Sequence, residues 1–161
     1  MMEKKHLGPI FVSFLSIIMF CISCSNSSFH LKDGYYTAEH SEYDEYGWKT
    51  FMTICVNNGI ISQVEFNAKD IGGFIKSWDM DYMRIMNAAS GTYPNEYSRF
   101  YASQFMEDQN ADSIDVLTGA TDSREYFVQL ARAVLENAKN GVTSVTVVPF
   151  RSRTGTEAPG D

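Results

Sequence analysis

The sequence predicts one α+β domain, a twisted antiparallel sheet packed by helices, and three observations support this class. Apolar strand patterns cover 49–56 and 60–66, and the Asn58-Gly59 pair between them is a strong signal for a tight β-hairpin. A further strand pattern covers 34–39. A long helix is predicted near the C-terminus, because apolar residues recur there at intervals of three and four. These residues are Phe127, Leu130, Ala131, Val134, Leu135 and Ala138.

Two helices are expected between the hairpin and the long helix. The segment 67–77 contains Gly72-Gly73 and is expected to be a loop. The first helix should begin near Asp79 and end at Ser90-Gly91. Its expected apolar face consists of Tyr82, Ile85, Met86 and Ala89. Pro94 fits the first turn of the second helix, whose apolar face is Tyr97, Phe100, Tyr101 and Phe105.

Short segments complete the predicted domain. The acidic, tyrosine-bearing segment 42–46 is expected to be an exposed loop, and the polar segment 107–112 a connector. A short strand is predicted over 114–117 and a last strand over 144–149. The long helix should stop at Asn140-Gly141.

The N-terminus has the features of a signal peptide, which is expected to cover 1–23. Lys4 and Lys5 precede an apolar segment over 7–22 that is too short and too interrupted to be a spanning helix. The ending Ile22-Ser23-Cys24 resembles a lipobox, although Cys21 stands where a leucine is usual. The alternatives are a plain secretory signal cut nearby and an uncleaved anchor.

The lipobox resemblance implies that Cys24 is the lipidated first residue of the mature protein. Several acyl chains on one cysteine would hold the domain at a membrane, since a single chain binds only marginally. Residues 24–32 are then a lipidated N-terminus and tether, 33–150 are the folded domain, and 151–161 are expected to be a disordered tail.

Charge and cysteine usage exclude several function classes. The chain carries a formal net charge of −7, and removing Lys4, Lys5 and Glu3 with the signal peptide leaves −8. Such acidity argues against nucleic-acid binding and against electrostatic adhesion to anionic lipid. Beyond the leader and the lipidated residue, Cys55 is the only cysteine, so no disulfide framework is possible. It is expected to be a small core residue.

No catalytic or metal site is predicted. The three histidines fall at no ligand spacing, and no Ser-His-Asp or Cys-His set is suggested. Asp79 and Asp81 are candidate metal ligands, but a helix-capping aspartate with a solvated neighbour explains them more simply.

The candidate site is the stretch from Asp115 to Thr121, read as Asp-Val-Leu-Thr-Gly-Ala-Thr, directly before the long helix. Thr121 should stand at or just before the helix N-terminus, where unpaired N–H groups and the helix dipole favour an anionic phosphate. The small Gly119 and Ala120 would let a phosphate ester approach the backbone. The alternative is an ordinary turn into a helix, with Asp122 or Ser123 as N-cap and Glu125 closing a capping box.

This stretch resembles the flavin-attachment motif of the FMN-binding domain family, whose members include flavin-carrying subunits of ion-pumping quinone reductases and a group of surface lipoproteins. In that family FMN is joined through its phosphate to the hydroxyl of the motif's last Thr or Ser. The resemblance therefore implies Thr121 as the FMN acceptor. It matches further motif positions to Asp115, Thr118, Gly119, Ala120 and Ser123.

The likeness extends over roughly the whole mature chain. The segment 33–39 looks like the family's opening strand. Several positions resemble the lipoprotein branch, namely Gly47-Trp48-Lys49, Asn58-Gly59, Lys76-Ser77, Asp81-Tyr82, Pro94 and Tyr97. A chance match to the motif alone would not extend this far.

The resemblance implies an exported flavoprotein, anchored on the extracytoplasmic side of a bacterial envelope and acting in electron transfer. Its implied partners are a separate FAD-dependent flavin transferase and redox proteins or quinones. Such carriers need no dedicated substrate, so an electron-transfer protein is favoured over a substrate-specific enzyme. Candidate walls for the flavin ring are Trp48, Trp78, Tyr82 and the segment 72–74. The alternatives are a non-catalytic surface lipoprotein without cofactor and a protein that binds FMN non-covalently.

Overall fold

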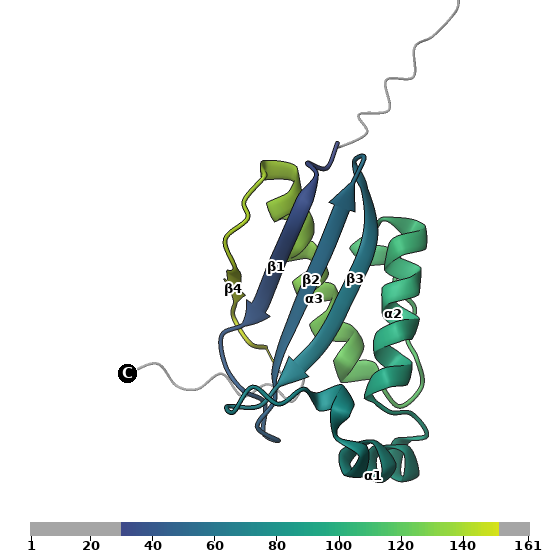
Figure 1. The fold of residues 1–161 in the computed structure, drawn as a ribbon. Coiled ribbons are helices and arrows are strands. Elements are labelled where there is room, and N and C mark those ends of the chain that lie inside the picture. The colour runs from purple at the N-terminus through teal and green to yellow at the C-terminus, as the bar shows by residue number, and fades with distance from the viewer. Residues whose placement is uncertain (1–29, 152–161) are drawn as a thin grey trace, which may run out of the picture.

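The computed structural model describes residues 30–151, which form a four-stranded sheet and three α-helices (Figure 1). The expected signal peptide, Cys24 and all of the expected tail except Arg151 lie outside the described residues. The three-stranded part of the sheet consists of β1 (Gly34–His40), β2 (Lys49–Asn57) and β3 (Ile60–Lys69), each antiparallel to the next. The α+β class is confirmed.

The fourth strand makes the sheet mixed rather than wholly antiparallel. β4 (Thr146–Val148) pairs in parallel with β1, giving the order β3-β2-β1-β4. The cause is the path of the last helix, α3 (Thr121–Asn140), whose C-terminal end lies beside the start of the domain. There the Lys32 N–H donates to the Ala138 carbonyl at 2.9 Å. The chain therefore enters β4 from the same end of the sheet as β1.

The predicted hairpin is confirmed. Asn58 and Gly59 have φ of 53° and 75°, as a tight two-residue turn between twisted strands requires. The segment 67–77 is not all loop, because β3 continues to Lys69. A turn holds the end of β3: the Asp70 N–H donates to the Phe74 carbonyl, and the Phe74 N–H donates to the Asp70 carboxylate. Lys69 also pairs with Ile75 as an isolated bridge.

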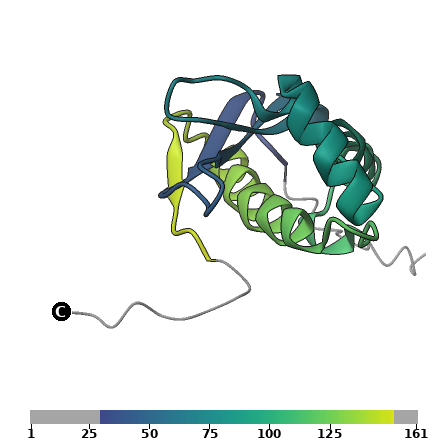
Figure 2. The same cartoon turned by 90° about the horizontal axis from the view of Figure 1, so that it is seen from below.

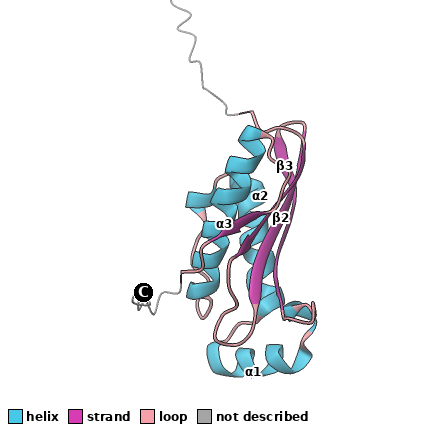
Figure 3. Cartoon of the chain, turned by 90° about the vertical axis from the view of Figure 1, so that its left-hand side faces the viewer, coloured by secondary structure: helices cyan, strands magenta, loops and turns pink. Residues whose placement is uncertain are grey.

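Two helices cover one face of the sheet. α2 (Pro94–Asp108) packs on β3, and α3 packs on β1 and β2 (Figure 3). The core lies between the sheet and these helices, where Phe127 is fully buried and its ring contacts those of Phe66, Tyr101 and Phe105. The expected apolar faces of α2 and α3 are confirmed.

Cys55 is not a core residue. Buried residues alternate along β2, and Thr50, Met52, Ile54 and Val56 point toward the helices. Cys55 therefore points to the other face of the sheet, where it is half buried and paired across the strands with Tyr35. Side chains along a strand alternate between the two faces of the sheet, so Cys55 points away from the helices that cover its neighbours in the strand.

α1 (Met80–Ser90) follows a short 3₁₀ turn, η1 (Lys76–Trp78), and lies beyond the end of the sheet (Figure 1). Its bounds agree with the prediction, and its buried face agrees in part: Tyr82 and Met86 are half buried, as predicted. Met83 is buried, whereas Ile85 is 67% exposed and Ala89 is exposed. α1 is seated through Tyr82, Met83 and Met86 and through its last residue, Ser90, which lies against Gly119, so the predicted apolar face is correct for Tyr82 and Met86 and wrong for Ile85 and Ala89.

The predicted strand over 114–117 is absent from the structure. After α2 the chain forms a 3₁₀ turn, η2 (Ala111–Ser113), and then an irregular segment. The backbone of this segment is hydrogen-bonded to side chains rather than to a neighbouring strand. Arg124 Nε donates to the Ile114 carbonyl at 2.8 Å, and the Asp115 N–H donates to Gln104 Oε1 at 2.8 Å. The buried Ile114 side chain explains why the segment is apolar.

Asp79 is the N-cap of α1, as predicted, because its Oδ1 accepts from the Tyr82 N–H at 2.8 Å. We expect Asp79→Ala to lower the free energy of unfolding by about 1 kcal/mol, the usual effect of losing an N-cap. Urea unfolding followed by circular dichroism measures this. Asp81→Ala is the matched control, because the exposed Asp81–Arg84 ion pair on the same helix should contribute almost nothing. Equal losses in both variants would contradict the capping role.

Candidate functional site

A cavity of about 800 Å³ opens at the N-terminal end of α3. Figure 2 shows the surrounding elements from that end of the molecule, with α1 and α3 on one side and the β1–β2 loop on the other. The volume is within the usual range for cofactor pockets, about 300–1,000 Å³. It is lined by Asp44, Glu45, Tyr46, Lys76, Tyr82, Met86, Ala89, Ser90, Gly119, Ala120, Thr121, Asp122, Ser123, Tyr126 and Phe150.

Thr121 is the first residue of α3 and lines this cavity. The residue before it, Ala120, is the N-cap and makes no side-chain capping bond. Neither Asp122 nor Ser123 caps the helix, so the ordinary capping-box alternative is wrong. Between residues 30 and 151, no acceptor bonds the N–H groups of Thr121, Asp122 and Ser123. Unpaired N–H groups and the helix dipole together favour an anion at this position.

The turn before α3 explains the small pair of the motif. The Ala120 N–H donates to the Leu117 carbonyl at 3.0 Å, and Gly119 has a φ of 83°, which favours glycine. A Cβ on Gly119 would overlap the carbonyl oxygen of Ser90, the last residue of α1. The end of α1 therefore packs against the turn at Gly119. This contact requires glycine at position 119, in addition to the access that a small residue gives to a phosphate.

Ala120 is fixed by its carbonyl and its burial. The Tyr101 hydroxyl on α2 donates to the Ala120 carbonyl at 2.8 Å, and the Arg124 N–H donates to the same oxygen at 3.0 Å. The Ala120 side chain is buried. These bonds set the direction in which α3 begins and therefore where Thr121 stands.

The structure brings only part of the predicted motif together. Gly119, Ala120, Thr121 and Ser123 line the cavity. Asp115 and Thr118 are exposed and do not belong to its lining. Asp115 takes part in the fold through its backbone N–H, which is bonded to Gln104.

One wall of the cavity is the β1–β2 loop, which the sequence predicted as an exposed loop. The Asp44 carboxylate holds it, because Oδ1 accepts from the N–H groups of Tyr46 and Trp48 at 2.9 Å each. Gly47 supplies the positive φ of 82° that closes the turn. Asp44, Glu45 and Tyr46 consequently face the N-terminal end of α3.

Among residues 30–151, Lys76 provides the only lysine or arginine side chain in the cavity lining. Its Nζ lies 4.7 Å from the ring centroid of Tyr82 and 5.7 Å from that of Trp48. Burial lowers the pKa of Lys76 to about 8, and the charge of Asp44 acts in the opposite direction. Burial also raises the pKa of Tyr82 to about 12, with a smaller contribution from the Asp44 charge.

The other wall is aromatic. The rings of Tyr126 and Phe150 line the cavity and lie 5.3 Å apart between centroids. Both pack against the buried His40, each with a centroid distance of 5.3 Å. Burial lowers the pKa of His40 to about 4, with the Gln129 side chain opposing the shift, so the imidazole is neutral at pH 7.

Of the candidate walls for a flavin ring, Tyr82 alone lines the cavity. Trp48 lies behind it, with a centroid distance of 5.9 Å between the two rings. Trp78 is 66% exposed and contacts Phe74, outside the cavity lining. The loop residues at 44–46, together with Lys76, Tyr126 and Phe150, were not identified from the sequence.

The residues of the cavity fit a phosphate ester joined to a planar aromatic group. A hydroxyl and unpaired N–H groups suit the phosphate, while the aromatic side chains and the ammonium suit a planar ring that carries partial negative charge. Within residues 30–151, no three His, Cys, Asp or Glu side chains gather closely enough to hold a metal ion. The same part of the chain contains no helix long and apolar enough to cross a bilayer.

The fold and the site together define the class of protein: an α+β domain with a cavity at the start of its last helix. No family model matches the chain. The chain is 39% identical over 119 residues to the 15 kDa lipoprotein of Treponema pallidum (strain Nichols), covering 74% of this chain and 83% of that protein. It belongs to the family of that lipoprotein.

A solved structure supports the same fold. The crystal structure of the CPE2226 protein from Clostridium perfringens superimposes with a TM-score of 0.72 at 38% sequence identity. The match covers 75% of this chain and 99% of the clostridial chain.

Proposed function

We propose that the protein is a lipoprotein, anchored through Cys24 on the extracytoplasmic side of a bacterial membrane, that carries FMN covalently on Thr121 and transfers electrons. The observation that carries the proposal is the position of Thr121 as the first residue of α3, open to a cavity of about 800 Å³ and beside three unpaired N–H groups. The lipoprotein name of the treponemal relative supports the anchor.

The residues that line the cavity would have distinct parts in this function. The Thr121 hydroxyl would be the acceptor: its Oγ would bond to the phosphorus of the FMN phosphoryl group as the pyrophosphate bond of FAD breaks, with AMP as the leaving group and the hydroxyl proton released to solvent. The separate flavin transferase carries out this exchange. Thr121, Asp122 and Ser123 then offer their N–H groups to the phosphate, while Tyr82, Tyr126 and Phe150 offer aromatic surface to the ring. Bound FMN supplies reversible uptake of electrons.

Two substitutions at one position test the attachment. The protein is produced together with the flavin transferase, and its intact mass is measured. We expect wild type to gain one FMN unit less one water, Thr121→Ser to retain the adduct, and Thr121→Val to lose it completely because valine has the same shape without a hydroxyl. Peptide mapping should place the adduct on residue 121 rather than on the neighbouring Ser123.

Two other results would exclude covalent flavin. Fluorescence that leaves the protein on a denaturing gel would indicate non-covalent FMN in the same cavity. A colourless protein with unmodified Thr121, isolated from its own cells, would favour a non-catalytic surface lipoprotein that keeps the fold without the cofactor.

A further inference from the structure

Lys76 is a cation without an anionic partner in the part of the chain that the structure describes. It makes no ion pair there, although it is half buried and lines the cavity. The rings of Tyr82 and Trp48 lie beneath its ammonium group. Cation–π contacts offset only part of the desolvation of an ammonium group. An anionic partner for Lys76 is therefore expected from a ligand.

The nearby carboxylates do not take this role. The Asp44 charge acts on Lys76 from beyond ion-pair distance, and Asp44 Oδ1 accepts from the N–H groups of Tyr46 and Trp48. Glu45 and Asp122 are exposed to solvent. The tyrosines that face this region, Tyr46, Tyr82, Tyr97 and Tyr126, come from the β1–β2 loop, α1, α2 and α3. The pKa values of Tyr46, Tyr82 and Tyr97 are raised, that of Tyr46 by the neighbouring carboxylates and those of Tyr82 and Tyr97 mainly by burial, so these three phenols are neutral at pH 7.

Lys76 lines two spaces that share part of their lining. Besides the main cavity it lines a smaller extension of about 30 Å³ that reaches toward the core residues Phe66 and Tyr97. Asp44, Ser123 and Tyr126 are also shared by the two spaces. Lys76 and Thr121 therefore line the same cavity, and a ligand attached at Thr121 that fills it would lie beside Lys76.

We propose that the Lys76 ammonium stabilises the negative charge that a flavin ring gains on reduction, and that it thereby raises the reduction potential of FMN carried on Thr121. This inference rests on the proposed function. Uptake of two electrons and one proton adds one negative charge to the ring, and a cation close to the ring favours that state. The electrons come from a redox partner protein in the cell and from dithionite in the test.

The ring is favoured over the phosphate as the partner of Lys76 for a structural reason. A phosphate on Thr121 already has the three unpaired N–H groups at the start of α3. Lys76 comes from η1, and its ammonium lies over the ring of Tyr82, which belongs to the aromatic part of the cavity lining. The two arrangements differ in a measurable way, because the phosphate keeps its charge on reduction and the ring does not.

The test is the reduction potential of the flavin-loaded full chain, measured by equilibration with a redox dye during titration with dithionite. We expect Lys76→Met to reduce the ratio of reduced to oxidised flavin at least tenfold at a fixed ambient potential. This corresponds to about 30 mV for a two-electron couple, toward more negative values. Lys76→Gln should shift the potential in the same direction, and Lys76→Arg should stay near wild type. Lys32→Met is the matched control, because it removes the same charge at the opposite end of α3, where Lys32 Nζ bonds the Asn140 carbonyl.

Several outcomes would overturn the inference. An unchanged potential in both neutral variants overturns it, and so does an equal shift in Lys32→Met. Weaker FMN loading at an unchanged potential assigns Lys76 to the phosphate instead. Mass measurement before the titration separates the two proposals: wild type without FMN removes the proposed function itself, whereas loaded wild type with an insensitive potential removes only the role of Lys76.

Discussion

Gly119→Ala is expected to destabilise the domain by about 3 kcal/mol or more and to distort the cavity beside Thr121. A left-handed backbone conformation costs an L-residue roughly 1–2 kcal/mol, and Gly119 has a φ of 83°. The new Cβ would also overlap the Ser90 carbonyl oxygen, a backbone atom that no rotamer change can move. Overpacking of this kind typically costs about 1–3 kcal/mol. Urea unfolding of purified protein measures the loss.

Gly73→Ala is the matched control for this prediction. Gly73 has nearly the same φ, 84°, but a Cβ there would meet nothing within 4 Å. It should therefore lose only the conformational part, about 1–2 kcal/mol. The difference between the two variants measures the contact between α1 and the turn before α3. If both variants lose the same free energy, Ser90 does not press on Gly119.

Acidification from pH 7 to pH 5 is expected to destabilise the protein by about 2 kcal/mol through His40. The imidazole is fully buried, and its pKa in the folded state is about 4 against about 6.5 for an unperturbed histidine. Below pH 6.5 the unfolded chain binds a proton that the folded chain does not. Stability therefore falls as the pH falls, by about 1.4 kcal/mol per unit, until the pH reaches about 4.

His40→Phe isolates this effect. Phenylalanine keeps the edge contacts with Tyr126 and Phe150 but cannot bind a proton. The free energy of unfolding of this variant should change little between pH 7 and pH 5. Asp33 and Glu39 have a lowered pKa and titrate below this window, so they do not confuse the comparison. Parallel losses in wild type and variant would show that His40 is not responsible.

The position of Thr121 was predictable because it depends on local sequence. The apolar period of the long helix runs back to the motif, and a threonine at its start can only stand at or near the first turn. The hairpin at Asn58-Gly59 was predictable for the same reason, since its turn chemistry is contained in two residues. Both features depend on contacts between near neighbours in the chain.

The rest of the cavity depends on contacts between distant segments. Lys76 and Tyr126 are 50 positions apart and meet only because η1 and α3 converge at one end of the sheet. The segment 114–117 has the apolar character of a strand, yet its backbone is bonded by Gln104 and Arg124 from two different helices. No local pattern encodes those partners, so the strand prediction was wrong.

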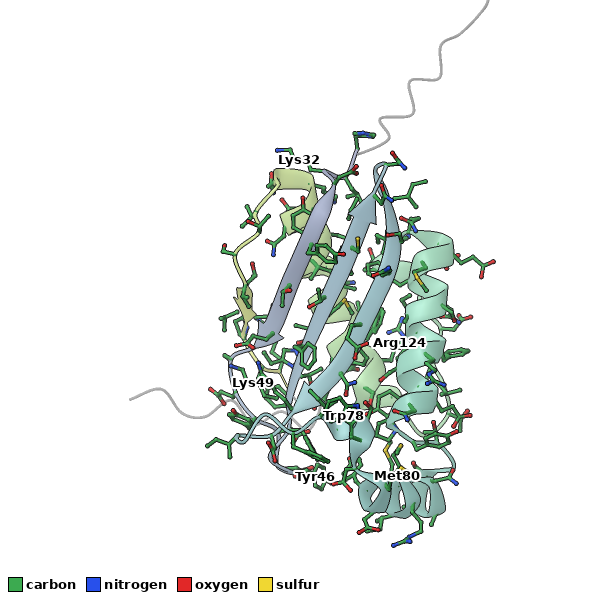
Figure 4. The ribbon with its side chains drawn as sticks, in the orientation of Figure 1. Lys32, Tyr46, Lys49, Trp78, Met80 and Arg124 are labelled. Atoms are coloured by element: carbon green, nitrogen blue, oxygen red, sulfur yellow. The ribbon has the colours of Figure 1, made fainter. Side chains whose placement is uncertain are left out.

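The length of α3 separates Thr121 from the point at which the chain enters the domain. The domain begins beside the C-terminal end of this 20-residue helix, and Thr121 is at the other end, about 30 Å away along the axis. Figure 4 shows the same polarity, with Lys32 at one extremity of the molecule and Tyr46 at the other. If the protein is anchored through Cys24 and carries FMN on Thr121, as we propose, the flavin would lie at the end of α3 away from the start of the domain, and a diffusible or protruding redox partner would reach it more readily than a quinone dissolved in that bilayer.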